Sequence, residues 1–177
     1  MNQYSPKAVM RVFNGGQKLN EASLNKLFLK QLDNIYCIKK HLVNVLPPLA
    51  DMASFRDLKA AILENTDQLK MQILRMDVIY KIFGAKQKKN KCIGIKTISL
   101  EAYIATRVDD QPPIERDMAL LIHLQIIESV EMAYFDLLKR IASNLENKEI
   151  EMLLKQNFET ATKSKKLYEL IAKEYIS

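Results

Sequence analysis

Several residue types that signal other classes of protein are scarce in this sequence. Its 177 residues include two cysteines, two histidines, four glycines, five prolines and no tryptophan. Two cysteines cannot supply the framework of a disulfide-stapled secreted domain, so a reducing compartment and a cytoplasmic location are the default expectation. The shortage of glycine and proline, beside abundant Leu, Ile, Ala, Lys and Glu, favours an all-α chain.

Long hydrophobic runs and concentrated charge are also missing. No apolar run reaches the roughly 18 residues that a membrane span requires, and the N-terminal segment MNQYSPKAVMRVFNGG has no signal-peptide core. The net charge of +6 is modest, and the basic clusters at 86–91 and 163–166 lack the interleaved aromatic residues typical of nucleic-acid binding. We therefore expect neither a membrane nor a nucleic acid as a partner.

Hydrophobic periodicity predicts four long helices and one short helix. The expected helices cover residues 23–46, 54–83, 97–107, 118–142 and 147–175. Pro47 and Pro48 should stop the first helix, because proline disfavours helix in the residue before it. Gly84 is a natural C-terminal cap for the second helix, and Pro112 and Pro113 suit the first turn of the fourth. Such helices with short links form an antiparallel four-helix bundle, with the short helix packed across one end or side.

The chain is short enough for a single domain. Residues 1–20, which contain the helix-breaking pair Gly15-Gly16, read as a flexible N-terminal lead-in. Residues 21–177 read as one bundle domain, and that length can bury a sizeable core.

Two carboxylates interrupt the apolar face of the helix at 118–142. The residues that share this face are Leu121, Leu124, Glu128, Glu131, Phe135 and Leu138. Their three- and four-residue steps place them in one line on one side of the helix. A carboxylate withdrawn from water costs several kcal/mol unless a cation or hydrogen-bond donors meet it. Glu128 and Glu131 together therefore require a metal, a Lys or Arg, or a shared proton.

The other long helices also carry polar residues at mid-height on the face expected to point inward. The expected inward line of the first helix is Phe28, Leu32, Ile35, Lys39, Leu42 and Leu46. In the second helix Asn65, Gln68 and Gln72 interrupt the line Leu58, Ile62, Leu69, Ile73, Met76 and Tyr80. The expected line of the last helix is Leu153, Gln156, Thr160, Ser164, Leu167 and Ile171. Polar residues on all four helices indicate a polar site in the bundle core, where such folds build metal sites.

Five stretches resemble, in order, the ferritin-like proteins of the YciE/YciF type. They are LFLKQLDNIYCIKKHLVNVLPPLA, FRDLKAAILENTDQLKMQILRMD, KCIGIKTI, RDMALLIHLQIIESVEMAYFDLL and LLKQNFETATKSKKL. The similarity covers about residues 24–172. It implies a ferritin-like four-helix bundle with an added short helix, a homodimer, a stress-related role and a carboxylate-bridged di-iron site.

The resemblance also implies that the di-iron site has degenerated in this chain. The first-helix Glu of the family corresponds to Lys39, and the second-helix His and Glu correspond to Asn65 and Gln68, beside Asp67. In the fourth helix Glu128 and Glu131 are kept, but the intervening His is Ser129. The last-helix Glu-Glu pair is Glu159-Thr160. The vestigial metal ligands would thus be Glu128, Glu131, Asp67 and Glu159.

An ammonium close to Glu128 or Glu131 would supply the positive charge that iron would have given, and would repel a metal ion. We therefore expect a polar core network in place of iron. Its expected members are Lys39, Asn65, Gln68, Glu128, Glu131, Thr160 and Ser164. In one alternative, Lys39 reaches the surface while the two glutamates share a proton; in another, residual metal binding remains.

The sequence favours no enzyme chemistry. Neither Cys37 nor Cys92 has an obvious His partner, and no phosphate loop or Ser/His/Asp arrangement is present. Cys37, in an apolar helix, is expected to be packed and inert. We expect a non-enzymatic cytoplasmic homodimer with no cofactor and no identifiable small-molecule substrate. The alternative is an iron-binding, weakly ferroxidase-like oxidoreductase that uses Glu128 and Glu131.

Overall fold

The computed structural model describes residues 18–107 and 111–176, which form five helices. These are α2 (Glu21–Met52), α3 (Arg56–Ile82), α4 (Ile93–Ala105), α5 (Pro113–Asn144) and α6 (Lys148–Ile176). The expected lead-in at 1–20 lies mostly outside the described residues. The all-α architecture predicted from the sequence is confirmed, and the short helix begins four residues earlier than the expected 97–107.

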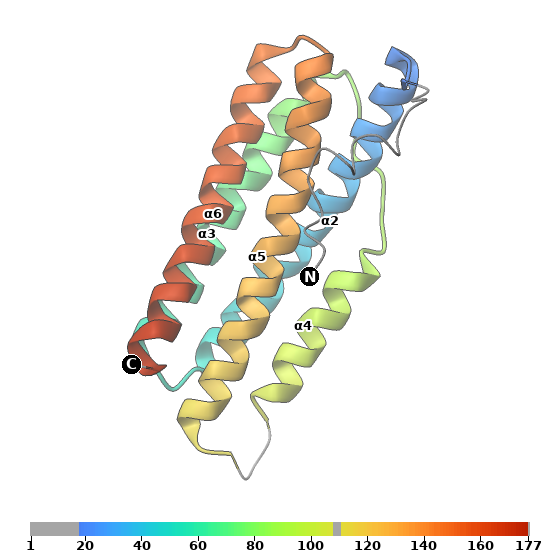
Figure 1. The fold of residues 1–177 in the computed structure, drawn as a ribbon. Helices are drawn as coiled ribbons and strands as arrows, with labels where there is room; N and C mark the ends of the chain where they lie inside the picture. The colour runs from blue at the N-terminus through green and yellow to red at the C-terminus, as the bar shows by residue number, and fades with distance from the viewer. Residues whose placement is uncertain (1–17, 108–110, 177) are drawn as a thin grey trace, which may run out of the picture.

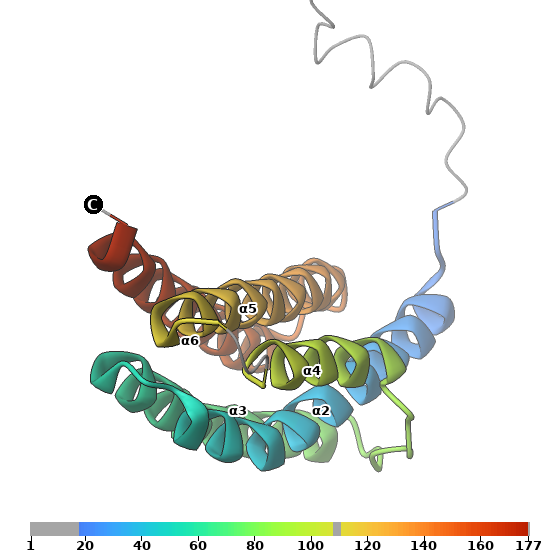
Figure 2. The same cartoon turned by 90° about the horizontal axis from the view of Figure 1, so that it is seen from below.

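The four long helices run up and down as an antiparallel bundle (Figure 1). Seen along its length, α5 and α6 form one layer and α2 and α3 the other (Figure 2). The chain crosses from α3 to α5 through α4, which lies beside α5 and α2 at one edge of the bundle. This crossover brings the middle of α2 opposite the middle of α5, where the polar residues lie.

Several helix ends carry capping residues. Asn20 accepts a hydrogen bond from Ser23 N at 2.9 Å at the start of α2, and Asn147 accepts one from Ile150 N at 3.0 Å before α6. Gly84 has φ +62° and follows α3, and Ala85 N bonds to Tyr80 O at 3.0 Å. That pattern is a Schellman C-cap, so the predicted role of Gly84 is confirmed.

The start of α3 is capped from another helix. Its N-cap residue Phe55 offers no side-chain cap. Instead the carboxylate of Asp117, the fifth residue of α5, accepts from Phe55 N at 2.6 Å and from Ser54 N at 2.8 Å. Asp117 is 1 % exposed, so this buried cap ties the start of α5 to the α2–α3 turn.

The predicted stop at Pro47 and Pro48 is wrong, because α2 continues through both prolines to Met52. Each proline removes a backbone donor from the helix. However, the extra turn buries Leu49 and Ala50 completely. Burying a leucine contributes about 1.5–3 kcal/mol, which offsets the poor local propensity.

The inward lines predicted for α2 and α5 are confirmed residue by residue, since every member is at most 1 % exposed. The line predicted for α6 is displaced. The buried residues of α6 are Ile150, Leu154, Asn157, Ala161, Tyr168 and Ile171. Of the predicted line only Ile171 is buried; Gln156 is exposed, and the other members are half-buried. In α3, Ile73 and Gln68 are half-buried, whereas Asn65 and Gln72 point inward.

The expectation of unpaired cysteines is wrong. Cys37 of α2 and Cys92 at the start of α4 form a disulfide, with Cα atoms 6.0 Å apart. Sequence spacing could not show this, because the two cysteines are 55 positions apart and all of α3 lies between them. Because the two cysteines are paired, they no longer support the prediction of a reducing compartment.

By length and composition alone, α5 could cross a membrane. The expectation that no stretch qualifies therefore needs correction. The core helix of a bundle passes the same test. The buried carboxylates Asp117 and Glu131 on α5 bond to groups of the α2–α3 turn and of α2, which is how a core helix of a bundle behaves.

Candidate functional site

A fully buried ion pair joins α2 to α5 at the centre of the bundle. The ammonium of Lys39 donates to Glu131 Oε2, and both residues are 0 % exposed. The Lys39 ammonium also lies 5.2 Å from the centre of the Phe135 ring, one turn further along α5. Lys39 therefore does not extend to the surface, and that alternative is wrong.

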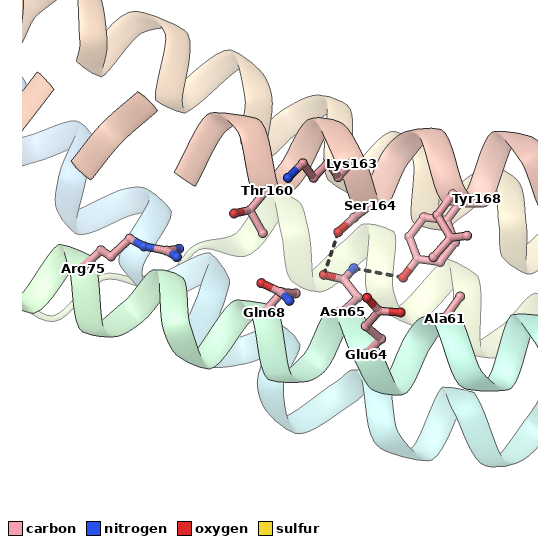
Figure 3. A pocket seen from close by; sticks show the side chains of 10 residues that line it. Ala61, Glu64, Asn65, Gln68, Arg75, Thr160, Lys163, Ser164 and Tyr168 are labelled. Atoms are coloured by element: carbon pink, nitrogen blue, oxygen red, sulfur yellow. Dashed lines mark hydrogen bonds between the residues drawn. The ribbon is translucent and has the colours of Figure 1, made fainter. Parts of the chain in front are cut away.

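The other buried carboxylate, that of Glu128, is bound by the side-chain amide of Asn65. Asn65 of α3 donates from Nδ2 to Glu128 Oε1 at 2.6 Å and to the Tyr168 hydroxyl oxygen at 2.9 Å. Ser164 of α6 donates to Asn65 Oδ1 at 3.4 Å (Figure 3). Asn65 thus connects α5 to α6, and the complete cluster draws on all four long helices.

One oxygen of each glutamate, Glu128 Oε2 and Glu131 Oε1, has no protein partner. Burial, and then the nearby charge of Glu131, raise the pKa of Glu128 well above its ordinary value. The raised pKa favours a neutral Glu128, whose proton can be shared between the two glutamates. The cluster is then electrically neutral: one ammonium, one carboxylate and one neutral acid.

Burial also raises the pKa of Tyr168, the largest single cause being the loss of water around its hydroxyl group. This phenol therefore stays neutral and serves as a hydrogen-bonding group. Because a dry interior disfavours each additional charge, the arrangement keeps the number of charges at two.

The residues of this cluster do not fit a di-iron centre. Such a centre requires about four carboxylates and two imidazoles with free lone pairs. Here Lys39 and Asn65 each donate to one oxygen of the two glutamates, so that only one oxygen of each carboxyl group is left without a protein partner. Within residues 18–107 and 111–176, no group of three His, Cys, Asp or Glu side chains is placed to hold a metal ion.

The other predicted ligands lie on the surface. The Asp67 side chain is 75 % exposed and pairs with Lys70 at 2.7 Å. Glu159 is also exposed and lies 3.9 Å from Lys155. Neither can reach Glu128, so their assignment as ligands beside Glu128 and Glu131 is wrong; each faces away from the core. Between Asp67 and Gln68, the half-buried Gln68 is nearer the core.

Two expected members of the polar network are displaced from it. Thr160 is half-buried and donates to the backbone of its own helix, Gln156 O, at 2.8 Å. Gln68 lines a polar pocket of about 330 Å³ between α3 and α6. Figure 3 shows Thr160 and Ser164 on one wall of this pocket and Gln68 and Asn65 on the other. Ser164 joins the network at its edge, through Asn65.

Sequence reasoning missed a second polar contact in the core. Gln72 of α3 donates to Asn157 O at 3.0 Å, and Arg75 donates to Asn157 Oδ1 at 3.2 Å. Tyr168 was missed with Asn157, because both belong to the true inward line of α6. The steps from Ile150 through Asn157 to Tyr168 are as regular as those of the predicted line, so periodicity alone could not choose between the two.

Four antiparallel helices with polar residues from each at the centre, and a crossover helix along one edge, define a ferritin-like helical bundle. Residues 23–177 match the family described as "Domain of unknown function (DUF892)", and the chain belongs to this family. The resemblance to YciE/YciF-type proteins is thereby confirmed.

Two solved structures share the fold. The Escherichia coli stress protein YciF superposes with a TM-score of 0.82 at 24 % identity, over 86 % of this chain and 96 % of that one. YcfI from Rhodopseudomonas palustris, described as a candidate structural protein, gives a TM-score of 0.78 at 22 % identity, over 88 % and 97 % of the two chains. At these identities the likeness establishes the fold. A comparison with curated proteins gave no match.

Proposed function

We propose that this protein is a non-enzymatic member of the YciE/YciF-type ferritin-like proteins, in which a Lys–Glu polar network replaces the di-iron centre. The observation that carries the proposal is the Lys39 ammonium on Glu131, fully buried at mid-height in the bundle. The E. coli relative is described as a stress protein, and a stress-related role through binding or assembly is the corresponding role for this chain.

The argument depends on charge. A divalent cation at Glu128 and Glu131 would lie within a few ångströms of the Lys39 ammonium, in a medium where like charges repel strongly. To admit the metal, Lys39 would have to lose its proton or leave the core, and Asn65 would have to release Glu128. The ion pair therefore stabilises the same carboxylates that iron would require.

One observation favours the alternative of residual iron binding or weak ferroxidase-like activity. Glu128 Oε2 and Glu131 Oε1 have no protein partner, and both lie in the core. Two such oxygens could bind one metal ion if the proton on Glu128 left. This alternative uses Glu128 and Glu131 only, because Asp67 and Glu159 face solvent.

Anaerobic titration with ferrous iron separates the two functions. Protein purified without chelator is compared with the variants Glu128→Gln and Glu131→Gln, and bound iron and melting temperature are measured together. We expect less than about a tenth of an equivalent bound and no shift of the melting temperature, since a ligand that binds only the folded state must stabilise it. Stoichiometric binding that both variants abolish would overturn the proposal and support the iron-binding alternative.

We also infer that the protein is a homodimer. A row of exposed apolar residues on α5 supports a dimer: Ile122, Ile126 and Leu137 are 56, 43 and 40 % exposed. They recur on the face of α5 opposite Glu128 and Glu131, and such faces are typical of helix–helix contacts between subunits.

A further inference from the structure

We infer that the Cys37–Cys92 disulfide is a thiol–disulfide exchange site, and that its reduction releases α4 from its place over the buried Lys39–Glu131 pair. This inference goes beyond the proposed function and does not depend on whether the core binds metal. It rests on the position of the disulfide, on the packing of α4 and on the chemistry of Cys92.

The disulfide fastens the start of α4 to the middle of α2. Cys37 lies two residues before Lys39, and Cys92 is the N-cap residue of α4. Two weaker contacts lie nearby: Asn90 donates to the Asn34 side chain, and Lys88 N donates to Asp33 Oδ1 at 2.9 Å. The disulfide is the one covalent link between α2 and this end of the crossover.

The helix α4 lies against α5 and, less extensively, against α2 (Figure 2). A cavity of about 380 Å³ lies under the first turns of α4, lined by Ile38 of α2, Val130 of α5 and Ile95 of α4. Ile38 and Val130 are the chain neighbours of Lys39 and Glu131. The start of α4 therefore lies at the level of the ion pair, beside a pocket that opens to solvent.

The contact surface of α4 is small. Ile95, Ser99 and Ala102 are buried, and Ile98 and Tyr103 pack half-buried against the core. The helix also exposes large apolar residues: Ile93, Leu100 and Ile104 are 67, 57 and 56 % exposed. A helix with so little buried area opens more readily than the rest of a domain. Its covalent link to α2 should therefore decide how often it opens.

The surroundings of Cys92 favour exchange. Its sulfur lies at the N-terminus of α4, where the helix dipole stabilises a thiolate, and next to Lys91. Cys92 is thus the better leaving group of the pair. Both cysteines are half-buried, so an external thiol can reach them.

The exchange needs a dithiol reductant. One thiolate of the reductant attacks Cys37 Sγ and forms a mixed disulfide, while the S–S bond breaks and Cys92 leaves as a thiolate. The second thiol of the reductant then displaces Cys37. Overall, two electrons and two protons pass to the protein, which gains two thiols, and the reductant becomes a disulfide.

Hydrogen exchange of the folded protein tests the inference. Oxidised protein is compared with the same protein in dithiothreitol and with the double variant Cys37→Ser/Cys92→Ser. We expect exchange of the amides of 93–105 to accelerate by at least about tenfold on reduction, while α3 and α6 are unchanged. The double variant should match the reduced protein and should not respond to dithiothreitol.

Two results would overturn the inference. Unchanged exchange of 93–105 after reduction, shown by mass to be complete, would mean that packing alone holds α4. A disulfide that dithiothreitol reduces only after denaturation would be a structural bond and not an exchange site. Single variants Cys37→Ser and Cys92→Ser provide a check, because each should open α4 as far as the double variant does.

Discussion

The two buried carboxyl groups are neutralised in different ways. The charge of Glu131 is balanced by the Lys39 ammonium, whereas the raised pKa of Glu128 favours its protonated form. Lys39 donates to Glu131, whereas Glu128 accepts from Asn65, and burial raises the pKa of Glu128, which favours its neutral form. The ion pair predicted from the sequence is present, and the neutral form of Glu128 stays a prediction. The ion pair and the neutral Glu128 can be tested by separate variants.

Replacing Lys39 by alanine should lower the free energy of unfolding by about 3–5 kcal/mol, because Glu131 would be left as an unpaired buried charge. Urea denaturation measures the change. Adding Glu131→Gln to Lys39→Ala should recover part of the loss. As a control, Lys70→Ala breaks an exposed pair and should change stability by less than about 1 kcal/mol. A loss from Lys39→Ala as small as that of the control would contradict a buried pair.

Replacing Glu128 by glutamine should change the pH dependence of stability. The folded-state pKa of Glu128 is raised above its ordinary 4.5, so the folded state holds a proton that the unfolded chain has released. This contribution is complete below pH 4.5 and is lost as the pH rises through the raised pKa. Glutamine keeps the acceptor for Asn65 and supplies a permanent donor to Glu131.

The variant should therefore gain stability relative to the natural protein as the pH rises from 4.5 to neutrality. Urea denaturation at a series of pH values gives the difference between the two proteins. Parallel curves would show that Glu128 is already ionised in the folded state, and the neutral-acid assignment would then be wrong.

The sequence predicts which residues face the core where a helix has a single apolar stripe. On α2 and α5 the apolar residues on both sides of Lys39 and Glu131 fixed the inward face. On α6 two stripes compete, and the structure selects the one with Asn157 and Tyr168, because their partners Gln72 and Asn65 lie on α3. A single sequence does not contain that pairing across helices.

At the scale of elements, the local sequence signals for helix ends, such as glycine and proline, predicted some of the helix ends. They failed where contacts with another helix determine the end. Gly84 ends α3 by its own backbone conformation, and its sequence signal sufficed. The last turn of α2 forms despite Pro47 and Pro48, because Leu49 and Ala50 pack into the core. The start of α3 depends on Asp117, which is more than 50 residues away from it in the chain.

Replacing Asp117 by alanine should cost about 1.5–3 kcal/mol, since Phe55 N would lose a charge-assisted hydrogen bond in a buried position. Asp117→Asn should cost less, because one acceptor oxygen remains. Asp57→Ala, in the exposed first turn of α3, is the matched control and should change stability by less than about 1 kcal/mol. Equal losses for Asp117→Ala and Asp57→Ala would show that the buried cap is unimportant.

At the scale of the whole molecule, the apolar character of α5 has two origins. Its inward face fills the core, and its outward row of Ile122, Ile126 and Leu137 remains exposed. If that row forms the dimer interface, Ile126→Glu should weaken dimerisation by at least about tenfold, because a charge would be desolvated on both sides of a symmetric contact.

Analytical ultracentrifugation over a range of concentrations measures this change. Leu74→Glu on α3 is the control, since Leu74 is 56 % exposed on a different helix and should leave the association unchanged. A natural protein that sediments as a monomer at all concentrations would contradict the homodimer, whatever the variants do.

The lysine at position 39 also constrains how this sequence can evolve. A metal site would need a carboxylate at position 39 and an imidazole at position 65, besides Glu128 and Glu131. The change to a carboxylate at position 39, made alone, places three acidic groups in a dry interior, and a histidine at position 65, made alone, crowds the amide contacts of Glu128 and Tyr168. Each single step destabilises a marginally stable fold before any metal can compensate. Once such a bundle has acquired the lysine, selection for stability therefore opposes every first step back to a metalloprotein.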